Sequence, residues 1–387
     1  MNITPAPRIA IIGAGPGGLT CARILQRRGI AVTVYDRDAQ RDARNQGGTL
    51  DMHPDSGQVA LETAGLKEQF DRIARPEGEQ MRLLAHDGTV LFDNADQLAA
   101  GQRGPFGPSP EIDRGQLRDL LIDSLEPGTI RWGHGFHHAE PLGDGVHRLH
   151  FDDDTTAEAE LLIGADGAWS KVRPLVSTAI PAYTGVTFVE VGLDDVDTRH
   201  PTLAALTGHG TTMALHDNKG LIAQRNSHQH IRVYVGMRTD EHWYDKAGIE
   251  LADTAAVRDV LLKQFAGWSD ELFGFITDTD AGYINRPLYA MPVPHTWEHT
   301  PGVTILGDAA HLMSPFSGMG ANLAMLDGCH LAEAIAGESG IDEAIHAYES
   351  VMLPRSAEAA VGADEGVNSA FAPDSTKQAR AHLTATH

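Results

Sequence analysis

Residues 9–36, which read IAIIGAGPGGLTCARILQRRGIAVTVYD, contain the succession of elements that decides the fold. The apolar run at 9–12 is typical of a strand that is buried on both faces. Residues 19–28 predict a helix that ends at a glycine, and residues 31–35 predict a second strand. Together these segments predict a βαβ unit, the building block of a Rossmann-like α/β domain with a parallel sheet.

Three glycines in this unit form the pattern G-x-G-x-x-G, at Gly13, Gly15 and Gly18. The first permits a tight turn, the second lets the backbone approach a pyrophosphate, and the third allows a helix to pack closely on a strand. Asp36 ends the second strand, where a carboxylate accepts hydrogen bonds from a ribose 2′-hydroxyl and repels a 2′-phosphate. The pattern predicts bound FAD or NAD rather than NADP, and a purely structural glycine-rich turn is the alternative.

A strand-to-loop segment near the end of the chain favours FAD over NAD. Residues 303–311 read VTILGDAAH, so a buried strand runs into Gly307 and Asp308. Residues 315–322 then form a loop before a helix predicted at 323–336. The Asp308 carboxylate is placed to bind a polyol, and the loop offers backbone N–H groups to a polar ring edge. FAD has a ribityl chain and a flavin ring that use both features, whereas NAD has neither.

A third segment of the same kind lies between these two. Residues 161–173, LLIGADGAWSKVR, predict a strand that enters Asp166 and Gly167 and continues into a short serine-capped turn with a basic end. Taken alone, each strand–glycine–aspartate segment is equally compatible with an ordinary tight loop. In combination and order, the three segments resemble those of the single-component FAD-dependent aromatic hydroxylases, the para-hydroxybenzoate hydroxylase type.

The closer resemblance within that family is to the tetracycline-degrading flavin monooxygenases. Similar motifs occur in similar order and spacing over nearly the whole chain. The segments that carry this resemblance are Ala43-Arg44, Gly47–Asp51, Ser56–Gln58, Glu111–Arg118 and Gly307–His311. Most of them belong to the half of the chain that would bind the cofactor.

The resemblance implies non-covalent FAD and identifies candidate contacts to it. Asp36 would hold the adenosine ribose, Arg114 would reach the ribityl–pyrophosphate region, and Asp308 would hold the ribityl or pyrophosphate end. Asp51 matches a flavin-contacting acid, and Arg44 matches a position that contacts FAD or NADPH. The other cofactor candidates on matched motifs are Gly13, Gly15, Gly18, Arg37, Asp166, Gly307, Pro315, Gly318, Gly320, Ala321 and Asn322.

Several of these basic side chains have a structural alternative. Surface ion pairing is open for Arg44, Arg114 and Arg118, because acidic residues far outnumber basic ones in this chain. His311 is divided about evenly between packing beside Asp308 and a role near the flavin.

Between residues 181 and 294 the pattern changes to short alternating strands. Strands are predicted at residues 188–192, 211–215, 220–224 and 231–237. An amphipathic helix is predicted at 257–265, and a further hairpin at 83–92 turns at Asp87-Gly88. An antiparallel sheet inserted into a dinucleotide-binding domain places a pocket between the two, over the flavin.

The predicted fold is therefore α/β, with a Rossmann-like FAD-binding domain interrupted by an antiparallel β-sheet substrate domain. Residues 1–180 and 295–387, including C-terminal helices, would form the FAD-binding domain. Residues 181–294 would form the substrate-binding domain, and the hairpin at about 80–110 would belong to the substrate side.

The resemblance also assigns substrate positions. Glu190 and Thr211 stand where the tetracycline-degrading enzymes have a Gln and an Arg that hold the polar edge of the substrate, and Tyr234 stands where a substrate-facing His is found. Losing an Arg and gaining a Glu is unfavourable for an anionic edge, so a tetracycline and a related polycyclic phenol or polyketide both stay candidates. Met319 replaces a usual Gln of the flavin loop. The other substrate candidates are Met213, Pro315 and Phe316.

The chemistry that the resemblance implies is carried by the cofactor. NADPH or NADH, bound transiently, would reduce the flavin, and O₂ would form a flavin C4a-hydroperoxide that hydroxylates an electron-rich phenolic or enolic carbon. No HExxH or CxxC pattern occurs, and the histidine groups lack acidic or cysteine partners at ligand spacing, so no metal is expected. A non-oxygenating FAD oxidoreductase and a flavin-bound, drug-sequestering binder remain alternatives.

Composition narrows the partners of the protein. The 387 residues include 53 Asp and Glu against 30 Lys and Arg, a formal net charge of −23, which disfavours nucleic acid and anionic membranes. Cys21 and Cys329 lie among apolar residues of predicted helices and are expected to be buried. Residues 1–8 lack the character of a signal peptide. We expect a cytoplasmic enzyme that acts on a small polycyclic aromatic molecule, and its oligomeric state stays open.

Overall fold

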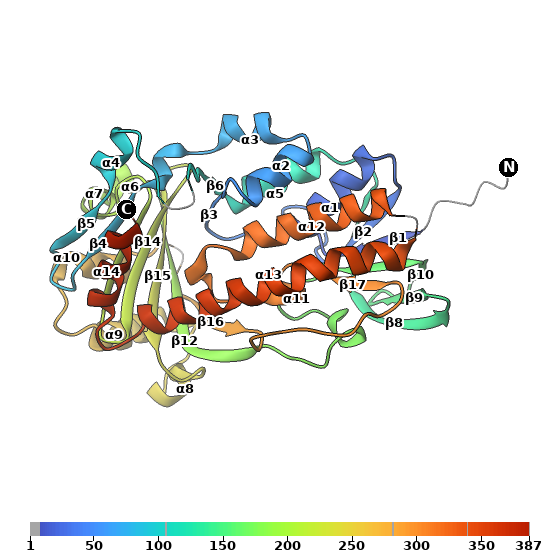
Figure 1. Cartoon of the computed structure of the whole chain (residues 1–387). Coiled ribbons are helices and arrows are strands. Elements are labelled where there is room, and N and C mark those ends of the chain that lie inside the picture. The colour runs from blue at the N-terminus through green and yellow to red at the C-terminus, as the bar shows by residue number, and fades with distance from the viewer. Residues whose placement is uncertain (1–7, 105–106, 281, 339, 387) are drawn as a thin grey trace.

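The computed structural model describes residues 8–104, 107–280, 282–338 and 340–386, and the predicted βαβ unit lies in the right-hand half of the molecule in Figure 1. The unit consists of β1 (Ile9–Ile12), α1 (Pro16–Arg27) and β2 (Val32–Asp36), as the sequence predicts. The start of the chain, on which the signal-peptide prediction depends, lies outside the described residues apart from Arg8.

A five-stranded sheet is built around this unit, in the order β17-β11-β1-β2-β7, and every neighbouring pair is parallel. Its other strands are β7 (Ile130–Trp132), β11 (Leu161–Gly164) and β17 (Val303–Ile305). β1 and β11 are buried at all four positions, because helices and a second sheet cover the two faces. The parallel order brings the three predicted strand-to-loop segments to the same edge of the sheet.

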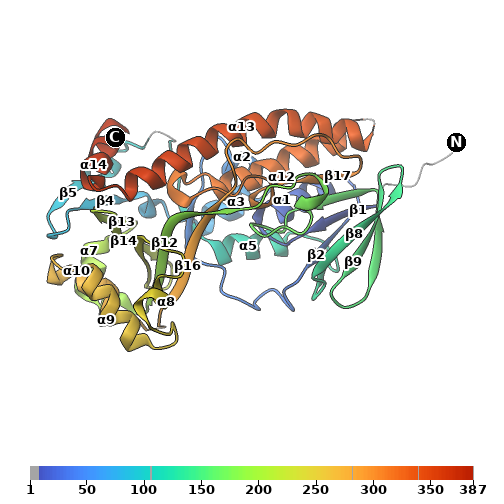
Figure 2. The same ribbon diagram turned by 90° about the horizontal axis from the view of Figure 1, so that it is seen from below.

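Helices form one layer against this sheet, and a small antiparallel sheet forms another (Figure 2). The helices are α1, α5 (Arg114–Asp123), α12 (Gly320–Gly337) and the long α13 (Ile341–Ala370). The small sheet consists of β8 (Phe136–Gly143), β9 (Val146–Phe151) and β10 (Thr156–Ala159). Cys21 of α1 and Cys329 of α12 are both buried, as expected.

The second large sheet has seven strands, in the order β16-β12-β15-β14-β13-β4-β5. In that order its strands are Ile284–Ala290, Ala182–Leu193, His230–Arg238, Lys219–Asn226, Thr211–His216, Met81–Leu84 and Val90–Asp93. All neighbouring pairs are antiparallel except β13 and β4. The four strands predicted in the middle of the chain and the predicted hairpin are confirmed, and both belong to one sheet.

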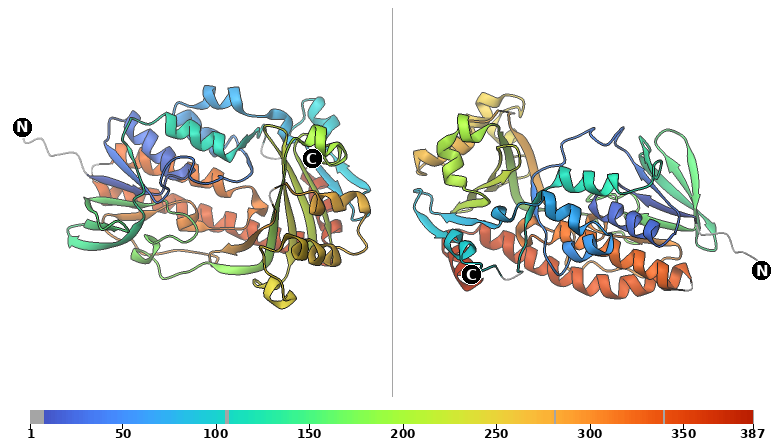
Figure 3. Two further views of the ribbon diagram at one scale, coloured as in Figure 1. Left: turned by 180° about the vertical axis from the view of Figure 1, so that it is seen from behind. Right: turned by 90° about the horizontal axis from the view of Figure 1, so that it is seen from above.

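The two faces of this seven-stranded sheet have different neighbours (Figures 2 and 3). On the outer face, Val189, Val191, Val233 and Val235 pack with α7 (Pro201–Thr207), α9 (Thr254–Gln264) and α10 (Asp270–Thr277). On the inner face, Phe188, Leu215 and Ile222 pack with Val367 and Phe371 at the end of α13. The outer face therefore forms a core of its own, and the inner face is turned toward the rest of the molecule.

Short elements connect the two large sheets. A two-stranded ribbon pairs β3 (Thr49–Asp51) with β6 (Glu111–Asp113), directly before α5. The remaining helices, including the three short 3₁₀ helices η1–η3, are α2 (Gly57–Thr63), α3 (Lys67–Ile73), η1 (Pro76–Glu79), α4 (Ala95–Ala99), η2 (Arg173–Leu175), α6 (Val196–Arg199), α8 (Trp243–Ala247), α11 (Asp308–His311), η3 (Pro315–Ser317) and α14 (Ser375–Thr386).

The C-terminal helices join the two parts of the molecule. α13 runs from the five-stranded sheet to the seven-stranded sheet (Figure 1), and Arg238 of β15 donates a hydrogen bond to the Phe371 carbonyl at its end. α14 then returns against β13. No helix in the described part of the chain is long and apolar enough to span a membrane.

Candidate flavin site and substrate face

The glycine loop between β1 and α1 has the geometry that its predicted roles require. Gly13 has φ of 110°, and a Cβ atom there would lie 2.2 Å from the carbonyl oxygen of Ala165. A Cβ atom on Gly18 would lie 2.4 Å from the Gly13 oxygen, so both positions exclude a side chain. A Cβ atom on Gly15 would meet nothing within 4 Å. Gly15 thus borders open space, where a cofactor could approach the backbone.

Asp36 is buried beside this loop and holds it in place. Its carboxylate accepts hydrogen bonds from the backbone N–H of Ala14 at 2.6 Å and of Asp38 at 2.8 Å. Arg118 supports the loop from the other side, because its Nε donates to the Ala14 carbonyl at 3.0 Å and its side chain is only 3% exposed. Arg118 is therefore not a surface residue, and its surface alternative is wrong. The sequence alone did not show that the first turns of α5 lie beneath the glycine loop.

The other predicted cofactor arginines are more exposed. Arg44 pairs with Asp38 at 3.0 Å and is 54% exposed, so it forms the partly exposed ion pair that was its alternative role. Arg37 and Arg114 are exposed, and neither forms a side-chain hydrogen bond or ion pair within the described ranges. The backbone N–H of Arg114 donates to Gly48 at 3.0 Å, which fixes the start of α5 beside β3.

The middle motif is a capped turn. The Asp166 carboxylate accepts hydrogen bonds from the Ser170 hydroxyl at 2.6 Å and the Lys171 N–H at 2.7 Å, and burial raises the pKa of Asp166. The Ser170 hydroxyl oxygen accepts from the Arg173 N–H at 2.9 Å, which confirms the predicted serine cap. Arg173 in turn donates to the Ala309 carbonyl at 2.7 Å. The second motif therefore supports the third.

Asp308 begins the four-residue helix α11 at the end of β17. Asp308 is exposed, and its carboxylate makes no hydrogen bond or ion pair with the residues that the structure describes. Gly307 adopts φ of 58° immediately before it. A carboxylate held at this edge without a protein partner has the character expected of a group that binds a polyol.

A buried ionic network holds this turn from below. The Asp327 carboxylate accepts from the Gly307 N–H at 3.0 Å, lies 2.6 Å from Nε2 of His311, and pairs with Arg355. Burial alone would lower the pKa of His311, but the negative charge of Asp327 outweighs it and the pKa is raised. The buried His311 side chain thus has the packing environment that was one of its two alternatives, and Asp327, with which it pairs, also holds the Gly307 N–H.

The flavin-loop candidates lie where η3 leads into α12. Gly318 has φ of 66°, and a Cβ atom there would lie 3.2 Å from a carboxylate oxygen of Asp51, so Asp51 borders the loop. The Asn322 side chain is fully buried: it accepts from the His53 N–H at 2.9 Å and donates to the Asp51 carbonyl at 2.7 Å. A cofactor contact by Asn322 therefore depends on its backbone, as it does for Gly320 and Ala321 in the same turn.

A buried acid beside Asp51 was missed in the sequence. Glu111 is opposite Asp51 in the ribbon and accepts a hydrogen bond from the Thr49 hydroxyl. Burial, with the charge of Asp51 as a second cause, raises the pKa of Glu111 to about 8. Arg75 and Asp113 form an ion pair of 3.1 Å next to it. The only sequence signal for Glu111 was its position at the start of the segment Glu111–Arg118, in which the sequence analysis singled out the arginines.

The predicted substrate residues lie together on the inner face of the seven-stranded sheet. Glu190 is paired with Tyr234, Tyr234 with Ile222, and Ile222 with Met213, so these side chains form a row across four strands. Thr211 lies in the neighbouring row, opposite Gln224. Phe316 reaches this face from the flavin loop, with its ring centroid 6.0 Å from that of Phe188.

We expected Glu190 to present a negative charge that repels an anionic ligand, and this expectation is wrong. Two arginines that the sequence analysis did not single out neutralise the Glu190 carboxylate. Arg232 of β15 donates to one carboxylate oxygen of Glu190, and Arg286 of β16 donates to the other at 3.1 Å. β12 lies between those two strands. Glu190 thus presents no unpaired negative charge to a ligand, and the cluster of Glu190, Arg232 and Arg286 is positive overall.

The cofactor side and the inner face meet at Gly48. A Cβ atom on Gly48 would lie 3.0 Å from the Tyr234 hydroxyl and 3.2 Å from the Gln224 side-chain oxygen. The segment that leads into Asp51 therefore crosses directly over the predicted substrate residues. Gly48, Asp51 and Gly318 border one side of the candidate site, and the row from Glu190 to Met213 borders the other.

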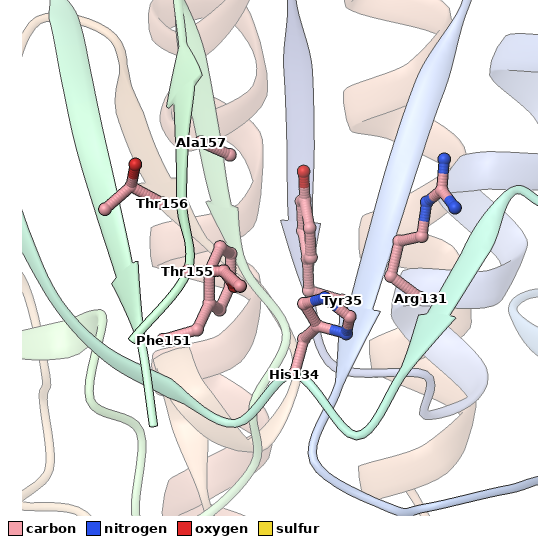
Figure 4. Close-up of a pocket in the computed structure, with 7 residues that line it drawn as sticks. All are labelled: Tyr35, Arg131, His134, Phe151, Thr155, Thr156 and Ala157. Carbon is pink, nitrogen blue, oxygen red and sulfur yellow. The ribbon is translucent and has the colours of Figure 1, made fainter. Parts of the chain in front are cut away.

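Two surface pockets lie away from this site. One, of about 220 Å³, lies between the central sheet and the β9–β10 hairpin; Tyr35, Arg131, His134, Phe151 and residues 155–157 line it (Figure 4). The other, of about 320 Å³, lies where α1 leads into β2, beside residues 126–129. Neither pocket is lined by the motif glycines or by Asp308, and no cluster of metal-binding side chains occurs in the described residues.

The residues present fit FAD. Open space at Gly15, an unpartnered carboxylate at Asp308 and an exposed guanidinium at Arg114 match a pyrophosphate, a polyol and an anion, respectively. The Asp308 carboxylate and the Arg114 guanidinium make no hydrogen bond or ion pair with the residues that the structure describes. Their arrangement around the edge of a parallel sheet is that of a dinucleotide-binding crevice.

Comparison with known proteins agrees with this geometry. Residues 7–266 and 276–362 match the family described as an FAD binding domain. The chain is 32% identical to monooxygenase penA of Penicillium thymicola, over 93% of this chain and 94% of that protein. It is 30% identical to the 3-amino-4-hydroxybenzoate 2-monooxygenase PtnB3 of Streptomyces platensis, over 97% and 91%.

Among solved structures, the chain is similar to tetracycline destructase Tet(55), with a TM-score of 0.75 and 18% identity over 99% of this chain and 96% of that one. That likeness concerns the fold. The family match and the relatives concern the cofactor and the type of enzyme, and they agree with the resemblance noted in the motifs. The chain belongs to the FAD-dependent monooxygenases of the para-hydroxybenzoate hydroxylase type.

Proposed function

We propose that this enzyme uses NADPH or NADH and O₂ to hydroxylate an electron-rich carbon of a phenolic or enolic aromatic molecule. The observation that carries the proposal is the position of Gly48, next to the Tyr234 hydroxyl of the inner-face row and on the segment that leads to Asp51 and the flavin loop. A planar ligand between the two would have the flavin loop on one side and the sheet on the other. FAD, once reduced, supplies the activated oxygen, so the protein has to bind, orient and exclude water.

Aromatic side chains are suited to hold such a ligand. The ring centroids of Phe188 and Tyr234 are 5.3 Å apart, and those of Phe316 and Phe371 are 5.6 Å apart. This apolar end of the inner face is closed by α13, so water has little access there. Tyr234 supplies a hydroxyl next to Gly48, where a phenolic oxygen could accept or donate a hydrogen bond.

Cofactor contacts are proposed as follows. Asp308 would bind the ribityl chain or pyrophosphate, Arg114 would neutralise phosphate charge, and Gly15 would admit the pyrophosphate to the backbone. Asp36 would bind the adenosine ribose, although its carboxylate already accepts two backbone N–H groups. Each carboxylate oxygen has a second lone pair, so both contacts can be made.

The substrate class is proposed from the site and from the relatives. PtnB3 is named for an aminohydroxybenzoate, which supports testing simple aromatic acids as well as polycyclic phenols and polyketides. A tetracycline remains a candidate within that wider group.

The test is a screen of FAD-loaded enzyme for substrate-stimulated oxidation of NADPH and NADH, across phenols, aminohydroxybenzoates, anthracyclines and tetracyclines. Product formed under ¹⁸O₂ should gain one labelled oxygen. Failure of the purified protein to take up FAD would contradict the cofactor site. Turnover without label would favour a non-oxygenating oxidoreductase, and tight ligand binding without stimulated oxidation would favour a sequestering binder.

A further inference from the structure

Two acidic side chains face each other beside the flavin loop. Asp51 of β3 and Glu111 of β6 are partners in the antiparallel ribbon, where directly opposite Cβ atoms are about 4.5–5.5 Å apart on the same face. Glu111 is buried, whereas the Asp51 side chain is 40% exposed, borders Gly318 and lies 2.8 Å from Nε2 of His53. The ribbon therefore holds one carboxyl group inside the protein and the other at the cofactor site.

The surroundings of Glu111 supply no cation of its own. Arg75 is the basic side chain next to it, and Arg75 pairs with Asp113 at 3.1 Å and donates to the Thr49 hydroxyl at 3.0 Å. The Glu111 carboxyl contacts that same hydroxyl, and it forms no ion pair with the residues that the structure describes. A buried carboxyl group without a counter-ion is more stable in its neutral form.

The pair therefore shares one proton at neutral pH. Burial is the main reason that the pKa of Glu111 is raised to about 8, and the charges of Asp51 and Asp113 raise it further, whereas the Thr49 hydroxyl and Arg75 lower it. Two adjacent carboxyl groups that both ionise repel each other, and the buried member of the pair is the one that keeps a proton.

We propose that Glu111 holds the single proton of this pair, so that Asp51 faces the cofactor as a hydrogen-bond acceptor, and that FAD binding tightens the hold of Glu111 on that proton. Glu111 is then a positioning residue, because it acts on the cofactor only through Asp51. The inference rests on the proposed function, since it takes the flavin to lie against Asp51 and Gly318. A flavin there would exclude water from Asp51, whose charge would then act more strongly on Glu111.

The consequence is a link between FAD affinity and pH. A proton that is held more tightly in the complex is taken up on binding, so FAD binds best to the form in which Glu111 is neutral. FAD affinity should therefore weaken as the pH rises through about 8. We expect the dissociation constant of wild type to increase by about 3–10-fold between about pH 7 and pH 9.5.

The first experiment titrates apoprotein with FAD across this pH range and follows flavin fluorescence. Glu111→Gln carries a neutral amide in place of the neutral acid, so its dissociation constant should vary by less than about 2-fold. Calorimetry at about pH 8.5, in two buffers with different ionisation enthalpies, should detect proton uptake by wild type and not by Glu111→Gln. Equal pH dependence or equal proton uptake in the two proteins overturns the proposal.

Glu79→Gln is the matched control. The Glu79 side chain is 9% exposed at the end of η1, and burial raises the pKa of Glu79 as well. Its carboxylate pairs with Arg103 at 3.5 Å, outside the ribbon. Glu79→Gln should keep the pH dependence of wild type. If this substitution also abolishes that dependence, the effect does not belong to Glu111 and the proposal is overturned.

Asp51→Asn tests the coupling in the absence of FAD. Without the charge of Asp51, Glu111 should ionise at a lower pH. The stabilising contribution of an acid whose pKa is raised by folding is lost as the pH rises through the folded-state value, so the melting temperature of the apoprotein should begin to fall at a lower pH than in wild type. An unshifted fall contradicts the proposal.

These outcomes separate the inference from the proposed function. A wild-type protein that takes up no FAD at any pH would reject the cofactor site itself. FAD uptake with an affinity that does not depend on pH would reject the role of Glu111 and leave the monooxygenase function intact.

Discussion

The glycine loop and the inner face of the seven-stranded sheet form their parts of the site in different ways. At the glycine loop, Gly13, Gly15 and Gly18 act through the backbone, and they lie within a span of six residues. On the inner face, the Glu190 cluster acts through side chains from three strands, and Arg286 is far along the chain from Glu190. Local chain geometry is enough for the first, whereas strand order and register decide the second.

This difference explains why the sequence identifies the cofactor side of the site and not the substrate side. A backbone that approaches a phosphate closely in a tight turn needs glycines at fixed positions, because a Cβ atom there would block the approach. An ion cluster can be assembled from many positions, provided that the strands bring the groups together. The cofactor side is therefore readable from short motifs, and the substrate side is readable only from the assembled sheet.

The largest effect is expected for Gly13→Ala, which tests whether the loop depends on backbone geometry. The new Cβ would lie 2.2 Å from the Ala165 oxygen, at a φ of 110°. We expect a loss of about 2–5 kcal/mol of stability together with loss of FAD. Thermal unfolding and flavin absorption of the purified protein measure both effects.

Gly15→Ala is the control for that substitution. Gly15 has φ of −84°, which other residues adopt, and its Cβ would meet no protein atom within 4 Å. The apoprotein should keep its stability within about 1 kcal/mol, and FAD binding should be weakened. Normal FAD binding by Gly15→Ala would show that the open space beside the loop is not the pyrophosphate site.

Asp308→Ala is expected to have the next largest effect. Removing a carboxylate that binds the ribityl chain or pyrophosphate region should cost about 1.5–3 kcal/mol, or roughly 10–100-fold in FAD affinity. Titration of apoprotein with FAD measures it. Asp96→Ala removes another exposed carboxylate from the first turn of a short helix, α4, and should have no effect on FAD. Equal affinities for Asp308→Ala and wild type would refute the assignment.

The smallest effect concerns Glu111, at the boundary between the two regions. Burial raises the pKa of Glu111 from 4.5 to about 8. Its folded-state pKa is therefore above the unfolded value, so the stabilising contribution is complete below about pH 4.5 and is lost as the pH rises through about 8. Glu111→Gln imitates the neutral acid and should abolish this loss.

The measurement is the melting temperature of both proteins across that window. Glu111→Gln should melt close to wild type at about pH 5 and about 1–3 °C higher at about pH 9. Thr63→Ala is a control that removes a half-buried hydroxyl on α2, which donates to the Val59 carbonyl, and it introduces no titrating group. A constant difference between Glu111→Gln and wild type at all pH values would mean that Glu111 does not titrate in this range.

Much of the fold follows from sequence pattern. The βαβ unit, the three strand-to-loop segments and the four central strands are each marked by local periodicity and by glycine or aspartate at their ends. The side-by-side position of the hairpin strand β4 and the later strand β13 is not marked locally, because pairing over that separation depends on how the whole chain closes.

Several predicted side-chain environments changed in the folded protein. Arg118, weighed as a surface residue, is buried because α5 packs beneath the glycine loop and brings the Ala14 carbonyl within its reach. Asn322 keeps its place in the flavin loop, but its side chain joins α12 to the end of β3. In both positions the residue type was informative, and the partner could come only from another part of the chain.

The sequence by itself predicted the cofactor and the parallel FAD-binding architecture, because dinucleotide binding needs glycines and acids at fixed spacing within short segments. The class of enzyme followed from the resemblance of three such segments to a known family. Only the tertiary structure decided the electrostatic character of the substrate face. Glu190 by itself suggested a negatively charged site that repels anions. The pairing of β12 with β15 and β16 brings Arg232 and Arg286 to Glu190, so the net charge of the cluster is positive. Net charge at a site is a sum over neighbours in space, which linear spacing does not specify.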